Sequence, residues 1–472
     1  EFFKEGIVQL MFKQLRREPG FYRRLMTLAL PLVLQNLITT SLGFVDTFMV
    51  GLLGNAEMAA VTAANAPIFL VQVIIFGLMS GLCVLVSQYW GRGDTDAINR
   101  VMGVAMYAGV LVSSLVAIVL LVEPFAIMRL LTPNETLVQM GAPYLRIVGV
   151  SYIFNSVSSV YVAMQRSTEN PAFGMQVFTV SMLANTLLNY MFIFGKLGAP
   201  ALGITGAAVA TLSSRVLEFA IVLIYGLKNK RIPLCFSSLF RPGREIFKSF
   251  LRYSSPVICN ETLWGLGTTC ITMIMGHMAF STEMLAAYAI MGNIDKFSTV
   301  TCFGLAGATA VLVGKRIGEG AKPDEVYSLG ICLLTVATAV GIVVGLALGA
   351  LLPTFFLPVL YPLFQLSPLA TEIAVTMAIL FACTMPMRAF DISNITGLLR
   401  AGGDAKMASV IDLTPLWCAA IPLTAFLALV VHAPVFWICL AIQSESIFKM
   451  PLGVFRLRSR KWINDITRGA RP

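Results

Sequence analysis

The first residue that could do chemistry is Asp46, which lies within an otherwise apolar stretch, LGFVDTFMVGLLG, at residues 42–54. A charged side chain at the centre of a bilayer costs roughly 2.5–3.5 kcal/mol on the insertion scale. A carboxylate at that position is therefore expected to bind something that compensates its charge. We predict that Asp46 binds a cation or a proton.

Two later segments carry polar side chains that could complete a site around Asp46. Asn185 and Asn189 are one helical turn apart on one face of a segment, and Thr211 lies in the next segment along the chain. Counted along their helices, these oxygens lie at one depth of the membrane. An all-oxygen set of this kind suits a hard cation such as Na⁺, or a proton on Asp46 that the amides stabilise. The alternative is that the two amides only join helices to one another.

The second half of the chain holds its own carboxylates at a shared depth. Glu261 lies in CNETLWG with no basic residue nearby in sequence, and Asp391 lies in AFDISNITG. Both are predicted to take part in cation or proton coupling. Either could instead be structural, and for Asp391 the structural alternative is a contact with Arg388.

A third group could line a substrate cavity. Asp295 and Asp412 are further intramembrane carboxylates, and Trp264 and Trp417 offer flat aromatic faces that attract cations. Asp295 has Lys296 beside it as a possible partner, and such tryptophans are often core or lipid-facing.

Two further pairs of charged residues are predicted to be structural. Arg215 with Glu218 and Glu445 with Lys449 are spaced at i,i+3 and i,i+4, so the members of each pair are expected to neutralise one another outside the site.

Composition then identifies the elements that must position these residues. Hydrophobic residues make up 57% of the 472 and charged residues 12%, and the mean hydropathy is +0.82. These values are typical of a multi-pass, all-α membrane protein. The pattern predicts twelve spans, at residues 25–50, 57–88, 98–122, 136–163, 172–195, 203–227, 250–277, 284–314, 326–352, 369–398, 406–430 and 434–455.

The distribution of Lys and Arg predicts the orientation. The basic residues are concentrated in the N-terminal arm, the central loop, the tail and the even-numbered loops, and Arg400 is assigned to one of these loops. Only Arg129 and Lys196 are assigned to the opposite loops. By the positive-inside rule both termini are cytoplasmic. The net charge of +10 therefore indicates topology, with a weak attraction to anionic lipid, rather than binding of nucleic acid.

The chain also contains an internal repeat. FGLMSGLCVLVSQYWGRG at 76–93 matches FGLAGATAVLVGKRIGEG at 303–320, and Pro31 corresponds to Pro256. Repeats of six spans enter the membrane in the same direction, so a pseudo-twofold axis along the membrane normal relates two six-helix lobes. The predicted parts are an arm (1–24), a first lobe (25–227), a linker (228–249), a second lobe (250–455) and a basic tail (456–472).

At this point the sequence resembles a known family. The ALPLVLQNL…GFVDTFMVG opening, the duplicated six-span lobes, the GRG exit at 91–93 and the LLRAGGD exit at 398–404 are similar to those of multidrug and toxic compound extrusion (MATE) transporters. The resemblance covers essentially the whole chain. It implies a monovalent-cation site at Asp46, Asn185, Asn189 and Thr211, as in NorM-like members, and a functional glutamate at Glu261.

The predicted function is antiport: export of organic, cationic and amphipathic compounds in exchange for Na⁺ or H⁺ by alternating access, without a cofactor. The partners expected are small organic molecules and membrane lipid, around a monomer in the bacterial inner membrane. The alternative is a flippase for lipid-linked oligosaccharides, which would need an unpaired basic cavity. A channel fits two parallel lobes less well. An enzyme is disfavoured, because His277 and His432 are isolated and the nine cysteines form no CxxC pair.

Overall fold

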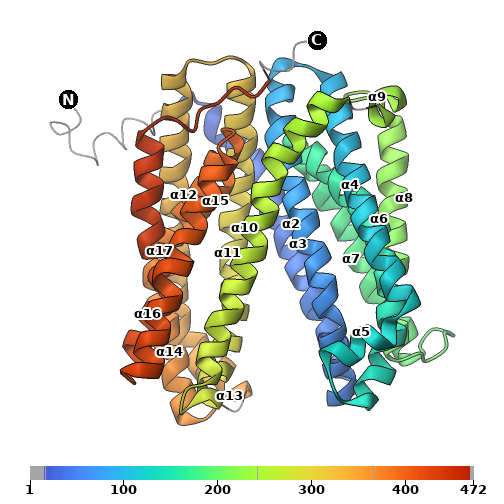
Figure 1. Cartoon of the computed structure of the whole chain (residues 1–472), viewed down its shortest axis with the longest axis vertical. Coiled ribbons are helices and arrows are strands. Elements are labelled where there is room, and N and C mark those ends of the chain that lie inside the picture. The colour runs from blue at the N-terminus through green and yellow to red at the C-terminus, as the bar shows by residue number, and fades with distance from the viewer. Residues whose placement is uncertain (1–14, 16, 242, 365, 468–472) are drawn as a thin grey trace. The chain divides into compact units, whose positions relative to one another are not determined.

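The computed structural model describes residues 15, 17–241, 243–364 and 366–467, and within these ranges the chain is helical, without a β-strand (Figure 1). The α-helices are α2 (Phe21–Gly51), α3 (Asn55–Arg92), α4 (Thr95–Val122), α5 (Pro124–Leu131), α6 (Glu135–Ser167), α7 (Pro171–Phe194), α8 (Ile204–Lys228), α9 (Phe236–Phe240), α10 (Arg244–Gly276), α11 (Ser281–Gly318), α12 (Pro323–Leu351), α13 (Tyr361–Leu363), α14 (Pro368–Ile392), α15 (Ala405–Pro415), α16 (Ile421–Ala425) and α17 (Val435–Arg458). Four segments are π-helical: η1 (Leu352–Leu360), η2 (Ser393–Leu399), η3 (Leu416–Ala420) and η4 (Phe426–Val430).

The predicted all-α membrane fold is confirmed. Among the described residues, eleven helices or continuous helical runs are long and apolar enough to cross a membrane. The remaining predicted span coincides with α10, whose Asn260, Glu261 and several threonines make it less apolar. Most helices extend beyond the predicted span at one end or both, because the backbone hydrogen bonds continue after the apolar sequence ends, whereas α7 and α10 stop one residue short of it at their C-terminal ends. Helix α10, for example, begins at Arg244 rather than at residue 250.

Local sequence signals set where the helices begin and end. Gly93 ends α3 with a φ of 74°, a left-handed conformation that glycine adopts without strain. Asp94 then caps α4, because its carboxylate accepts a hydrogen bond from the backbone N–H of Ala97 at 2.9 Å. The π-helical segments lie close to prolines, including Pro358 within η1 and Pro415 just before η3. Proline lacks the N–H that an α-helix needs, so the local hydrogen-bond register shifts.

The chain forms two compact units. The N-unit comprises Leu34–Ile258 with Thr467, and the C-unit comprises the described residues up to Val33 with Cys259–Ile466. In the N-unit, α6 packs against α3, α4 and α8, as Figure 1 shows. In the C-unit, α14 packs against α11, α12 and α17. The lobe boundaries expected from the repeat, at 25–227 and 250–455, remain a prediction.

Equivalent glycines of the repeat have the same packing role in each unit. In the N-unit, a Cβ added to Gly77 of α3 would lie 3.0 Å from backbone atoms of Ile258 on α10. In the C-unit, a Cβ on Gly304 of α11 would lie 2.9 Å from the backbone nitrogen of Val33 on α2. Both glycines therefore allow close contact between two helix backbones, which is a common use of small residues in membrane proteins.

Candidate functional site

The N-unit brings Asp46, Asn185 and Asn189 into one hydrogen-bonded cluster. The side-chain nitrogen of Asn189 donates to Asp46 Oδ1 at 2.5 Å and to Asn185 Oδ1 at 3.0 Å. Asn185 and Asn189 are each only 1% exposed. One turn of α7 thus places Asn189 against the carboxylate on α2 and Asn185 against Asn189, on the one face that the spacing of the two asparagines predicted.

Thr211 joins this cluster in a different way from the one predicted. Asn185 donates to Ser214 Oγ at 3.4 Å, and Ser214 donates to the backbone carbonyl of Thr211 at 2.9 Å. The Thr211 hydroxyl itself has no hydrogen bond to the cluster in the described part of the chain. Sequence reasoning missed Ser214, although it lies one turn after Thr211 on the same helix.

The cluster also has neighbours that the sequence did not assign to it. Arg215 forms an ion pair with Glu218 at 2.8 Å, and Glu218 also accepts a hydrogen bond from Ser181 at 3.2 Å. Arg215 interacts electrostatically with Asp46 as well. The predicted Arg215–Glu218 pair is therefore present, and it lies closer to Asp46 than the sequence indicated. Glu218 is fully buried, and its pairing with Arg215 compensates part of the positive charge that Arg215 brings near Asp46.

In the C-unit, Glu261 is paired with a cation. Arg400 donates to Glu261 Oε1 at 2.9 Å, and its side chain is only 2% exposed. The assignment of Arg400 to a loop is therefore wrong, and so is the picture of Glu261 as a lone carboxylate. Sequence distance hid the pair, because the two residues are separated by most of the C-unit. The Nε and Nη1 atoms of Arg400 are buried without a hydrogen-bond partner among the described residues.

Asp412 belongs to a second buried network in the C-unit. Lys449 donates to Asp412 Oδ1 at 2.6 Å and also to Glu445, one turn earlier on α17. Asn260 donates to the other oxygen of Asp412 at 2.7 Å. The Glu445–Lys449 pair was predicted, but its extension to Asp412 was not. Trp264 enters the same network, because its indole N–H donates to Glu445 at 3.3 Å.

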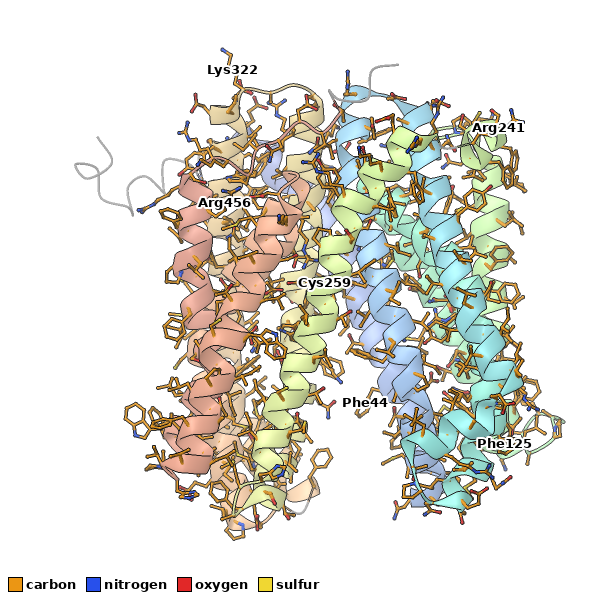
Figure 2. All side chains as sticks on the ribbon, viewed as in Figure 1. Phe44, Phe125, Arg241, Cys259, Lys322 and Arg456 are labelled. Atoms are coloured by element: carbon orange, nitrogen blue, oxygen red, sulfur yellow. The ribbon has the colours of Figure 1, made fainter. Side chains whose placement is uncertain are left out.

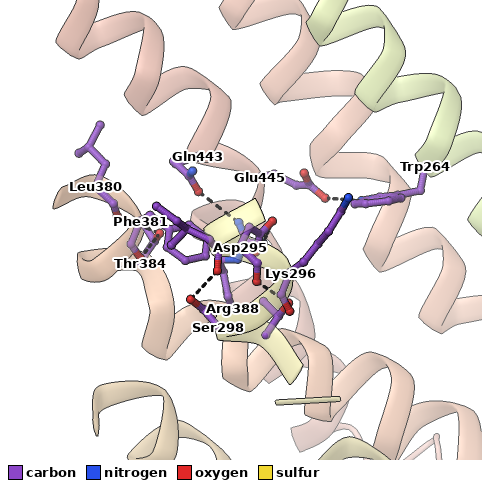
Figure 3. Close-up of polar contacts among 12 residues, drawn as sticks. Trp264, Asp295, Lys296, Ser298, Leu380, Phe381, Thr384, Arg388, Gln443 and Glu445 are labelled. Carbon is purple, nitrogen blue, oxygen red and sulfur yellow. Dashed lines mark hydrogen bonds and ion pairs between the residues drawn. The ribbon is translucent and has the colours of Figure 1, made fainter. Parts of the chain in front are cut away.

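Asp295 is bound by Arg388 rather than by Lys296. Figure 3 shows the guanidinium of Arg388 directed at the Asp295 carboxylate, with Nη2 2.7 Å from Oδ1 and 3.0 Å from Oδ2. The same guanidinium lies 4.6 Å from the ring centroid of Phe381. Arg388 is thus paired with Asp295, and its interaction with Asp391, the structural alternative for that residue, is electrostatic without a hydrogen bond among the described residues.

Asp391 differs from the other carboxylates of the C-unit. It is 5% exposed, and neither of its oxygens has a hydrogen-bond partner in the part of the chain that the structure describes. It lies at the end of α14, directly before the π-helical segment η2, and Lys449 interacts with it electrostatically. A nearly buried carboxylate without a direct partner can accept a proton or a cation.

The remaining aromatic residue, Trp417, lies on η3 with 37% of its surface exposed, and Trp264 is 40% exposed. Both could meet a ligand or a lipid chain. Among the described residues, no group of three or more His, Cys, Asp or Glu side chains could hold a metal ion.

These observations first define a class: a multi-pass helical membrane protein with ionisable side chains inside its spans, as in transporters. Within that class, the chain belongs to the MatE family, whose family model matches residues 31–191 and 256–438. The two matched stretches begin at Pro31 and Pro256, the prolines that the internal repeat equates. Members of this family are transporters rather than enzymes, and the resemblance noted in the sequence is confirmed.

Individual relatives match along nearly the whole chain. The uncharacterized transporter YisQ of Bacillus subtilis is 25% identical over 447 residues, which cover 93% of this chain and 94% of the relative. A probable multidrug resistance protein, NorM of Thermotoga maritima, is 25% identical over 454 residues, with 94% of each chain covered. A multidrug resistance MATE family transporter solved in an outward-facing conformation has the same fold, with a TM-score of 0.83, 17% identity and coverage of 95% and 98%.

Proposed function

We propose that this protein is a secondary antiporter that exports organic, mainly cationic and amphipathic compounds in exchange for Na⁺ or H⁺ by alternating access. Membership of the MatE family and relatives named multidrug resistance proteins support the export of drug-like compounds. We further propose that it acts as a monomer in the bacterial inner membrane with both termini in the cytoplasm.

The observation that carries the proposal is the Asp46 cluster. Asp46 is held by the neutral amide of Asn189 at 2.5 Å, and the nearest guanidinium, that of Arg215, is already paired with Glu218. A carboxylate that is bound mainly by amides keeps an uncompensated negative charge. Such a group gains most from a proton or a small cation.

The same cluster explains how the two ions would compete. A proton needs only the Asp46 carboxylate, and an Asn189 amide rotated by half a turn would add an acceptor for it. Na⁺ needs several oxygens at once, and those of Asp46, Asn185 and Asn189, with the Thr211 carbonyl close by, are the ones available. The buried Asn189 oxygen has no partner in the described residues, so it is free to serve either ion.

The ion gradients would supply the driving force. One positive charge moving inward contributes about 2.3 kcal/mol per 100 mV, and a tenfold concentration difference contributes about 1.4 kcal/mol. At the outer side, the incoming ion binds the Asp46 carboxylate and neutralises its charge. The organic cation then loses its electrostatic attraction to that carboxylate and is released.

In the C-unit, we propose that Asp391 is the carboxylate that remains available for an ion, with Glu261 beside Arg400 in a supporting role. Asp295 and Asp412 keep a possible substrate role with Trp264 and Trp417. Both carboxylates are already paired with cations, so a cationic substrate would have to displace Arg388 or Lys449 to reach them.

The flippase alternative loses support from the same ion pairs. A lipid pyrophosphate needs unpaired basic side chains, whereas Arg215, Arg388, Arg400 and Lys449 each contact a carboxylate within the described residues. Of the basic residues inside the spans, Arg146 on α6 and Lys296 on α11 have no ion pair in that part of the chain.

The test is transport in proteoliposomes with the Na⁺ and pH gradients imposed separately. We expect the parent protein to move a cationic dye against its concentration gradient under at least one of the two. Asp46→Asn should lose this accumulation, while Glu135→Gln, which alters an exposed carboxylate paired with Arg129, should retain it. Accumulation by Asp46→Asn at the parent rate would exclude the Asp46 site.

A further inference from the structure

The N-unit contains an apolar pocket that the export mechanism does not use. Its volume is about 350 Å³, at the lower end of the roughly 300–1,000 Å³ range of small-molecule sites. Helices α4, α6 and α8 form its walls, and the segment that runs from Leu234 through α9 forms one side. The helix walls are membrane spans, so this pocket lies within the transmembrane part of the N-unit, close to where α8 ends.

The α9 side of the pocket is fixed rather than loosely placed. The Asn99 side chain of α4 donates to the carbonyl of Pro233 at 3.1 Å and accepts from the backbone N–H of Cys235 at 3.3 Å. Ser238 donates to Asp96 at the start of the same helix. Farther along α4, a Cβ on Gly103 would lie 2.2 Å from the Leu239 carbonyl, so only glycine allows α9 to come this close.

The lining defines the chemistry of the occupant. The pocket presents no polar surface. Its lining includes two tyrosines, Tyr107 and Tyr161, and the Tyr161 hydroxyl already accepts hydrogen bonds from Gln165 and Asn229. At its edge, Tyr107, Phe236 and Phe240 are each about half exposed. A polar or charged compound would lose its hydrogen bonds with water on entering, whereas a hydrocarbon chain would gain contact with apolar walls.

Charge on the flanking residues selects the headgroup. Residues 228–248 contain Lys228, Lys230, Arg231, Arg241, Arg244 and Lys248, opposed by the single acid Glu245. The guanidinium carbon of Arg231 lies 4.7 Å from the ring centroid of Trp90. Figure 2 shows Arg241 beside α9, directly after the pocket residue Phe240. Arg241, Arg244 and Lys248 are exposed and have no carboxylate partner among the residues described. Basic residues next to an apolar surface of a membrane protein attract anionic lipid.

We propose that this pocket binds one acyl chain of an anionic phospholipid, whose phosphate is held by the basic residues at the end of α9, chiefly Arg241 and Arg244. The bound lipid ties the linker that joins the two halves of the sequence to the surrounding bilayer.

Photocrosslinking tests the proposal. The protein is placed in nanodiscs of dioleoyl phosphatidylcholine that contain a small fraction of a probe with a diazirine in its acyl chain, carrying either a phosphatidylglycerol or a phosphatidylcholine headgroup. We expect cross-links on peptides of α4, α6 and α9 to be at least fivefold more frequent with the phosphatidylglycerol probe. Arg241→Gln with Arg244→Gln should reduce this preference to twofold or less.

Two substitutions test the pocket itself. Val157→Trp, which fills the pocket from α6, and the milder Val110→Phe on α4 should both remove the pocket cross-links for either headgroup. The control is Val343→Trp, at a site on α12 that is 65% exposed. Absence of cross-links at the pocket, equal labelling by the two probes, or unchanged labelling in both filled variants would overturn the proposal.

Discussion

The intramembrane carboxylates of the two units are bound by different kinds of partner. In the N-unit, Asp46 is held by the neutral amide of Asn189. In the C-unit, Glu261, Asp295 and Asp412 are each held by Arg or Lys, and Asp391 is the exception, with no hydrogen-bond partner among the described residues. A carboxylate paired with a fixed cation has little to gain from a mobile one, whereas a carboxylate bound by amides still lacks its counter-charge. The duplicated halves thus share their packing, but we expect Asp46 in the N-unit to bind the coupling ion and the ion pairs of the C-unit to stabilise the fold.

The largest effect should come from breaking the C-unit network. Lys449→Met removes the cation between Asp412 and Glu445 and leaves two largely buried carboxylates without it, so we expect a loss of about 3–5 kcal/mol in the free energy of unfolding. Denaturant titration in mixed micelles measures this loss. The matched control is Arg316→Met, since Arg316 also contacts two carboxylates, Glu319 and Glu325, but at an exposed site. For Arg316→Met we expect a loss of about 0–1 kcal/mol in the free energy of unfolding. Equal losses for both variants would show that the buried network stabilises the protein no more than an exposed one does.

Glu261→Gln should have a smaller effect, because the amide oxygen of glutamine can still accept the hydrogen bond from Arg400. We expect a loss of about 1–2 kcal/mol in stability and coupled export within twofold of the parent. Efflux measured under separate Na⁺ and pH gradients provides the check. A complete loss of coupling in a folded Glu261→Gln protein would place ion binding in the C-unit and reverse the comparison.

Asn189→Ala should affect one ion and not the other. It removes an oxygen that Na⁺ needs, so the Na⁺ concentration for half-maximal export should rise about tenfold, equivalent to about 1.4 kcal/mol. Proton-driven export should persist, because a proton requires Asp46 alone. Asn293→Ala serves as the control, since the Asn293 side chain is exposed and donates only to a backbone carbonyl one turn away. Identical shifts for both ions would argue that Asn189 only positions Asp46.

The smallest effect concerns Cys235, which lies in the central loop and reports on which side of the membrane that loop is located. Hydrogen bonds with Ser237 and Ser238 lower the pKa of this exposed thiol. Its thiolate therefore forms at a lower pH than that of an ordinary cysteine. In a variant with Cys235 as its single cysteine, an impermeant maleimide should react with the thiol below about pH 8. The reaction should be slower when Ser238→Ala is added to that variant. Labelling should require lysed cells, whereas full labelling of intact cells would invert the topology.

The sequence predicted the helices well because a span is a local property. Each of the twelve apolar segments coincides with a helix or a continuous helical run to within about one residue at the ends that overrun it, and the repeat correctly equated Gly77 with Gly304 in their packing. Helical spacing also placed Asn185 and Asn189 on one face. These inferences need only the periodicity of one helix and the length of the bilayer.

The partners of the carboxylates could not be predicted in the same way. Spacing along one helix predicted Glu445 with Lys449 and Arg215 with Glu218, which are close in sequence. The partners of Glu261, Asp295 and Asp412 lie on other helices, so their identity depends on how each helix is rotated and on which helix it meets. Residue order alone fixes neither quantity, and Arg400 was consequently assigned to a loop although it is buried.

The most direct test measures the ion rather than the drug. In proteoliposomes without an imposed gradient, a cationic substrate added outside should enter the vesicles and drive H⁺ or Na⁺ out of them, followed with an entrapped pH dye or with labelled Na⁺ loaded inside. We predict that the parent and Glu261→Gln proteins move the ion, whereas Asp46→Asn, folded and still able to bind substrate, moves none. Substrate-driven ion movement in Asp46→Asn together with its absence in Glu261→Gln would contradict the assignment of coupling to the N-unit.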